Sequence, residues 1–158
     1  MKQFLTTIIC LLVLTTTAQE KTFKEFYKSH KKEADLSFNI PGFIANFFID
    51  SQDDEELEAL LDKSSNYKIL IYENNSDRVL RDFKKFVKNN KLKTIVRIKD
   101  GRDRVNIHFR EQKNRIREIV VNIQSESKDA ILLGLKTNLT RDELAAIISS
   151  SDIKISSK

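Results

Sequence analysis

Residues 94–139 read TIVRIKDGRDRVNIHFREQKNRIREIVVNIQSESKDAILLGLKTNL, and this stretch decides the fold. Short polar turns divide it into four segments in which apolar residues recur at every second position. In the second segment, for example, single polar residues separate Val105, Ile107 and Phe109. A period of two is typical of a β-strand, because successive side chains point to opposite faces of the sheet. The dipeptide Asp100-Gly101 predicts a type I′ turn after the first segment. The stretch therefore predicts four consecutive strands.

The remaining sequence adds helices and two more strands. Capping boxes, in which Thr is followed three residues later by Glu, predict helix starts at Thr22 and Thr140. The elements expected outside 94–139 are helices over 22–33, 41–49, from about 57, 76–90 and after 140, and strands over 36–40 and 67–73. The sequence thus predicts an α+β fold, with a mainly antiparallel sheet of five or six strands and helices packed chiefly on one face. Strand 67–73, the helix after it and strand 94–99 are expected to form a right-handed βαβ unit within that sheet.

The first eighteen residues predict a cleaved export signal. Lys2 supplies the positive start, residues 4–14 form an apolar core, and Thr16-Thr17-Ala18 resembles a cleavage site before Gln19. The apolar run is too short for a transmembrane span, which takes about 20 residues. The single cysteine, Cys10, follows Ile9 and lies too early to be a lipidation site. We expect residues 19–158 to form one domain that is periplasmic or extracellular, not lipidated and free of disulfides.

The sequence contains no catalytic signature. The 158 residues include two histidines, three glycines and one proline, and they form no glycine-rich phosphate loop, nucleophile elbow or metal-ligand cluster. The acidic run that begins at Asp50 fails as a calcium loop, since an EF-hand needs Gly where Glu55 stands and Glu where Leu61 stands. We expect no catalytic residue, no metal and no cofactor. A hydrolase with an unrecognised carboxylate site is the alternative.

One face of the predicted sheet is a candidate binding surface. If Val105, Ile107 and Phe109 point inward, an apolar centre of Ile95, Val120 and Leu132 points outward. Cations and amides surround that centre, and an uncovered face of this kind can dock a partner. Two other interpretations remain open, namely an ordinary solvated face and a face covered by the first helix. The candidate binding residues, hereafter the predicted patch, are Arg97, His108, Arg110, Val120, Leu132 and Lys136.

A basic helix face is the second candidate. The helix over 76–90 carries Arg78, Arg81, Lys84, Lys85 and Lys88 on the side opposite its apolar stripe. Such a face could bind an anionic partner, although most solvated helices look similar. The formal net charge of +5 permits contact with anionic molecules but also serves solubility.

Five short motifs are spread from the first helix to the last, namely Phe26-Tyr27-Lys28, Ile40-Pro41-Gly42-Phe43, residues 67–72, Asp100-Gly101 and the stretch from Leu133-Gly134-Leu135 to Leu144. In these motifs the chain resembles a family of exported Bacteroidota proteins catalogued as a domain of unknown function, number 4252. Many members of that family look like lipoproteins. The signal of this chain departs from that pattern, because Cys10 does not fit a lipidation site. The resemblance implies an exported location and a shared fold, and brings no activity or ligand.

These observations favour a non-catalytic envelope accessory protein. We expect it to contact another protein or an anionic surface component through the open sheet face. Nothing in the sequence points to nucleic acid.

Overall fold

The computed structural model describes residues 20–42 and 60–150. The predicted export signal, most of the expected helix over 41–49, the acidic run after it and the last eight residues lie outside the described residues. Within them, the structure has the expected α+β fold.

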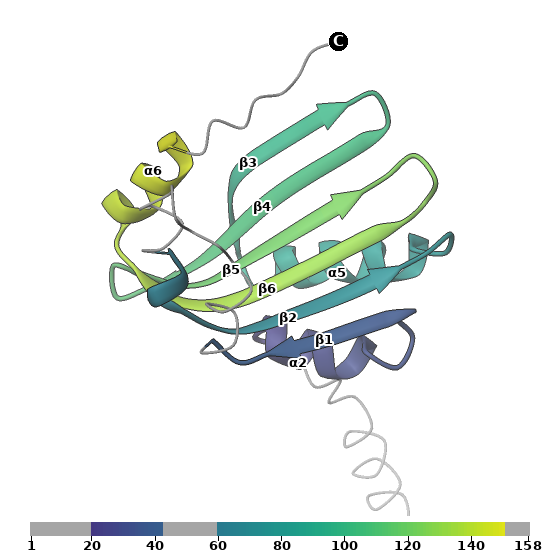
Figure 1. The fold of residues 1–158 in the computed structure, drawn as a ribbon, viewed down its shortest axis with the longest axis horizontal. Coiled ribbons are helices and arrows are strands. Elements are labelled where there is room, and N and C mark those ends of the chain that lie inside the picture. Colours follow the sequence, from purple (N-terminus) through teal and green to yellow (C-terminus); the bar gives the residue numbers. More distant parts are fainter. Residues whose placement is uncertain (1–19, 43–59, 151–158) are drawn as a thin grey trace, which may run out of the picture.

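Six strands form one sheet in which every pair of neighbours is antiparallel. Their spatial order is β1-β2-β6-β5-β4-β3, as Figure 1 shows. The four consecutive strands expected from residues 94–139 are four of the six strands, and neighbours in sequence are neighbours in space there. The strands are β1 Leu36–Ile40, β2 Ser64–Tyr72, β3 Lys93–Asp100, β4 Asp103–Gln112, β5 Arg115–Gln124 and β6 Ala130–Leu139.

The helix α5 (Asp77–Asn89) joins β2 to β3 across the sheet. The antiparallel pairings make β2 and β3 parallel to each other, as the expected βαβ unit requires. The two strands are not adjacent, however, because β6, β5 and β4 lie between them. The long crossover carries α5 over one face of the sheet, and this position determines where the candidate site lies.

One of the two tight hairpins differs from expectation in turn type. The β3–β4 loop consists of Gly101 and Arg102, and only Gly101 has a positive φ, of 57°. This pattern fits a type II′ turn rather than the predicted type I′. Between β4 and β5, Lys113 and Asn114 have φ of 51° and 59°, which is the type I′ pattern. Both turns match the twist of the flanking strands, so the strand order is unaffected.

Helices α2 (Phe23–His30) and α5 pack together on one face of the sheet. In Figure 1 both lie behind the strands. The capping box predicted at Thr22 is present, since the Glu25 backbone N–H donates to Thr22 Oγ1 and the Thr22 N–H donates to Glu25 Oε2. The first hydrophobic core lies between these helices and the sheet, and comprises Phe23, Phe26, Tyr27, Leu70, Tyr72, Val79, Phe83, Phe86, Leu92, Val120 and Leu132.

The opposite face of the sheet holds a second core beside α6 (Arg141–Ser150). Leu144 from α6 packs there with Leu61 and with Ile119 of β5. Part of this face is less covered, since the side chains of Ile123 in β5 and Ile131 in β6 are 39% and 36% exposed. This is the face of Val105, Ile107 and Phe109, which were expected beneath the main helical layer. That expectation is wrong: α2 and α5 cover the other face, and these three side chains are only partly buried.

A β-bulge explains the position of Ile95. Between Thr94 and Val96 the pairing of β3 with β4 shifts by one residue. An extra residue in one strand moves side chains to the other face. Ile95 therefore packs against the second core, and not with Val120 and Leu132 as expected.

Glu111 connects the ends of β3, β4 and α6. Its carboxylate accepts hydrogen bonds from Arg141 Nε at 2.6 Å and Lys93 Nζ at 2.8 Å. These two cations lower the pKa of Glu111 to about 2.

The position of α2 on the sheet depends on the absence of a side chain at Gly134 of β6. The Phe23 ring lies directly over Gly134 of β6, and a Cβ at that position would be 2.0 Å from Phe23 Cδ1. No relaxation short of moving the ring could accommodate a methyl group there. Gly134 is thus needed for the close approach of the helix.

We predict that Gly134→Ala destabilises the protein by about 1–3 kcal/mol, the usual cost of overpacking a core. Urea unfolding measures the change. Phe23→Ala removes the clashing ring atoms, so in the double variant the cost of Gly134→Ala should be smaller than in the wild-type background. Equal costs in both backgrounds would contradict the contact.

We predict a pH-dependent role for Glu111. A carboxyl group whose pKa is lower in the folded state stabilises the protein above its unfolded pKa and loses that effect as the pH falls. Glu111→Gln should therefore reduce the free energy of unfolding near neutral pH, and the difference from wild type should disappear between pH 4.5 and about 2. A difference that is independent of pH over this range would contradict the ion pairs.

Candidate functional site

The predicted patch does not lie on an open face. The side chains of Val120 and Leu132 are 0% exposed, because they belong to the core beneath α2 and α5. The expectation of an uncovered apolar centre is wrong. The alternative of a face covered by the first helix is closer to the structure, in which α2 and α5 cover the face together. Both faces of the central strands carry apolar residues, so alternation alone could not decide which face the helices cover.

The polar members of the predicted patch are divided between two grooves. Arg97 and His108 line a groove beside α5, which we call the α5 groove. Arg110 and Lys136 line a groove beside the start of α2, which we call the α2 groove. The structure therefore replaces one expected surface with two.

The α5 groove has a volume of about 880 Å³ and lies between α5 and the adjacent strands β3, β4 and β5. Seven cations line it, against one acid, Asp77. None of the seven forms an ion pair with any residue in the described part of the chain. Like charges held close together without counterions attract an anion from solution. The seven cations are Arg81, Lys84, Lys88, Lys91, Arg97, Lys99 and Arg104.

Uncharged polar groups line the same groove. The ring nitrogen Nδ1 of His108 lies 3.0 Å from Thr94 Oγ1. Burial, together with the nearby Arg97 cation, lowers the pKa of His108 below its ordinary value. Beside it, Asn122 is buried, and its Oδ1 has no hydrogen-bond partner among the described residues. The groove thus combines exposed cations at its rim with a neutral floor able to form hydrogen bonds.

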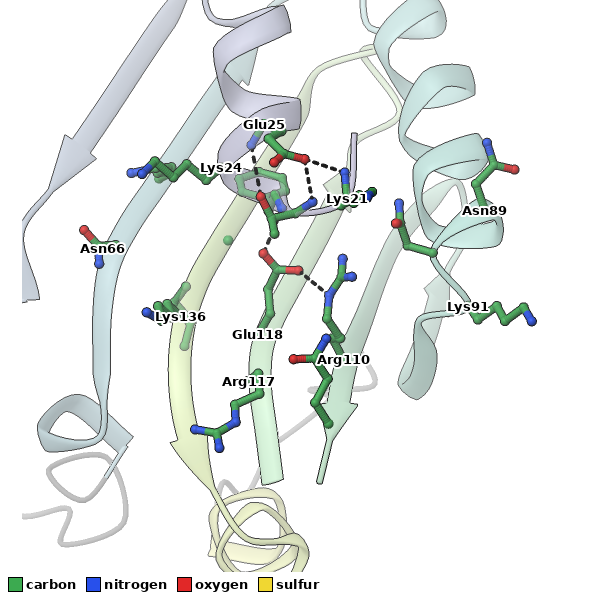
Figure 2. A pocket seen from close by; sticks show the side chains of 17 residues that line it. Lys21, Lys24, Glu25, Asn66, Asn89, Lys91, Arg110, Arg117, Glu118 and Lys136 are labelled. Atoms are coloured by element: carbon green, nitrogen blue, oxygen red, sulfur yellow. Dashed lines mark hydrogen bonds and ion pairs between the residues drawn. The ribbon is translucent and has the colours of Figure 1, made fainter. Parts of the chain in front are cut away.

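The α2 groove has a volume of about 820 Å³ and is also rich in cations. In Figure 2, Lys24 and Lys136 lie on one side of it, and Asn89 and Lys91 on the other. Within the described residues, no ion pair engages Lys24, Lys91 or Lys136. The cations that line it are Lys21, Lys24, Lys68, Lys91, Arg110, Arg117 and Lys136.

A buried ion pair forms the centre of the α2 groove (Figure 2). Glu118 Oε2 accepts a hydrogen bond from Arg110 Nε at 3.1 Å, and Glu118 Oε1 accepts one from the Phe23 backbone N–H at 2.7 Å. The side chains of Glu118 and Arg110 are 12% and 16% exposed. Burial raises the pKa of Glu118, although the Phe23 N–H and the Arg110 cation oppose this effect. The pair thus holds the first turn of α2 on the sheet.

Arg110 retains a spare donor beside this pair. Its Nη2 is buried and has no hydrogen-bond partner among the described residues. The two acids of the groove are both engaged, since Glu25 Oε2 accepts hydrogen bonds from the backbone N–H groups of Lys21 and Thr22. The remaining positive charge of the groove is therefore available to a ligand.

Sequence reasoning found half of the α5 groove and missed most of the α2 groove. The basic face of the helix over 76–90 was a separate candidate, and the crossover of α5 to β3 brings part of it beside Arg97. Only the three-dimensional path of α5 could unite the two. For the α2 groove, the usable signal was Gly134 between two leucines, which indicates that a bulky group approaches the strand there.

Two searches of the described residues were negative. No group of three or more His, Cys, Asp or Glu residues in this part of the chain is arranged to hold a metal ion. No helix within the same residues is long and apolar enough to cross a membrane.

Comparison with known proteins assigns the chain to one family. No curated protein and no solved structure matches it. A family profile described as a domain of unknown function, DUF4252, matches residues 23–147, which include every described helix and strand at least in part. The chain therefore belongs to the DUF4252 family.

Proposed function

We propose that this protein is a non-catalytic binding protein of the cell envelope, which holds an anionic partner in the α5 groove. The observation that carries the proposal is the convergence of seven unpaired cations on one groove with a hydrogen-bonding floor. A rim of this kind attracts anions over a long range, and the floor can then fix the orientation of a bound group.

Export belongs to the same proposal. Lys2, the apolar residues 4–14 and the small residues before Gln19 support a cleaved signal, and Ile9 before Cys10 argues against lipidation. We infer a Bacteroidota origin and a periplasmic or extracellular location. Anionic surface components are abundant in such an environment, so the charge of the groove suits the location.

Binding is favoured over the hydrolase alternative by the state of Glu118. A general acid needs a carboxyl group that can exchange its proton with a substrate. Glu118 has a raised pKa, yet both of its oxygens already accept hydrogen bonds, from Arg110 and from the first turn of α2. This arrangement suits a structural ion pair better than a proton donor.

We predict that the double variant Lys84→Glu/Lys88→Glu binds soluble heparin roughly tenfold or more weakly than wild type, a loss of about 1.4 kcal/mol or more. Both residues line the α5 groove. The salt dependence of binding should also become shallower, because fewer counterions of the polyanion are released. Calorimetric titration at several salt concentrations measures both effects.

The matched control is Arg78→Glu/Lys85→Glu. These residues lie on the same helix and give the same change in net charge, but neither lines the groove. Each forms an exposed ion pair, with Glu33 and Asp82 respectively, whose loss has little effect on stability. Equal weakening in both double variants would mean that only net charge matters, and would contradict the α5 groove as the binding site.

We predict that His108 lowers the free energy of unfolding as the pH falls below about 6.5. The pKa of His108 in the folded protein is lower than its ordinary value of about 6.5, so the unfolded chain binds the proton more readily. The free energy of unfolding should decrease as the pH falls through 6.5, and His108→Gln should flatten this decrease while retaining a group able to bond Thr94. Urea unfolding at about pH 7.5 and about pH 5.5 makes the comparison. An identical decrease in the variant would show that His108 does not carry the effect.

A further inference from the structure

Lys91 lines both grooves. It follows the C-cap of α5, so the chain passes there from the helix to β3, between the two lining sets. The grooves are therefore two parts of one cationic path that runs around the C-terminal end of α5. Seven cations line each part, with Lys91 common to both.

The backbone around Lys91 is fixed. The Lys91 N–H donates to the Lys88 carbonyl, and the Leu92 N–H donates to the Val87 carbonyl at 3.0 Å. Lys91 has a φ of 53°, in the left-handed region that favours Gly or Asn at the end of a helix. Next to it, Asn90 Nδ2 donates to the Glu20 carbonyl at 2.7 Å. This end of α5 is thus a rigid corner with an exposed cation.

The linings of both grooves point to the chemistry of the ligand. Their aromatic side chains are Phe23, Phe83 and His108, which are 2%, 2% and 7% exposed, so none offers a ring face on which a nucleic acid base could stack. Amide side chains line both grooves instead and can form hydrogen bonds with hydroxyl groups. These amides are Asn66, Asn89, Asn90 and Gln112 in one groove, and Asn106, Asn122 and Gln124 in the other.

From the shared Lys91, the two sets of cations and the amide linings, we propose that the ligand is one chain of an acidic polysaccharide that occupies both grooves at once. Sulfate or carboxylate groups would meet the cations, and hydroxyl groups would meet the amides. This inference rests on the proposed function of the α5 groove and extends it. Once part of a long chain is bound in one groove, its contact with the second groove is intramolecular and costs little further translational and rotational freedom. The long chain therefore binds more tightly than a chain that reaches only one groove.

The test compares a heparin tetrasaccharide with full-length heparin. Wild type should bind the long chain, per binding site, roughly tenfold or more tightly than the tetrasaccharide. The variant Lys24→Glu/Lys136→Glu alters only the α2 groove. It should lose most of this preference for length while binding the tetrasaccharide as wild type does.

Lys91→Gly separates the role in binding from any role in folding. Gly suits the left-handed backbone, so the variant should be at least as stable as wild type in urea unfolding. The same variant should nevertheless lose part of the preference for the long chain. Retention of the full preference in Lys91→Gly and in Lys24→Glu/Lys136→Glu would overturn the continuous path.

The outcomes distinguish this inference from the proposed function. If the tetrasaccharide fails to bind, or binds independently of Lys84 and Lys88, the α5 groove itself is wrong. If it binds there but the long chain shows no preference, only the continuous path is wrong. Single-stranded DNA and polyglutamate of matched charge are included as probes. Binding of either as tight as that of full-length heparin would overturn the assignment to a polysaccharide.

Discussion

The contact between Phe23 and Gly134 determines how α2 lies on the sheet, and the rest of the architecture follows from it. The ring occupies the space that a side chain on β6 would fill, so the helix approaches the strand closely. Phe26 and the α5 residue Phe86 pack against this ring, and Phe83 of α5 packs against Phe26 in turn. At the start of the helix, Glu118 accepts the Phe23 N–H and pairs with Arg110, which ties the same turn to the polar part of the sheet.

This packing explains why the polar residues of one sheet face lie in two grooves. The helices are narrower than the sheet and cover its apolar middle at Val120 and Leu132. Strand positions beyond that middle keep their cations and amides at the edges of the helical layer. The last turn of α5 ends between the two groups, where Lys91 adds a cation to each. The helix α5 also carries basic residues on its outer side, which makes both edges of the helical layer more positive.

The sequence predicted the strands and capped helices well because those features depend on local chemistry. The alternation around Val105 and the capping box at Thr22 are examples. It failed to choose the buried face, since Leu132 and Leu133 are both apolar and an alternating strand looks the same from either side. The bulge near Ile95 was also invisible, because an unpaired residue leaves no mark in composition. Of the candidate site, the cations were found, but their division required the path of α5.

The most direct test of the central claim is an NMR titration of the isotope-labelled protein with the heparin tetrasaccharide. If the ligand occupies the α5 groove, the side-chain amide signals of Asn106 and Asn122 should shift in proportion to saturation, because both line that groove. The side-chain signals of Phe38, Ile123 and Ile131, which lie exposed on the opposite side of the sheet, should stay in place. Shifts confined to those three residues, with the amides unmoved, would contradict the account.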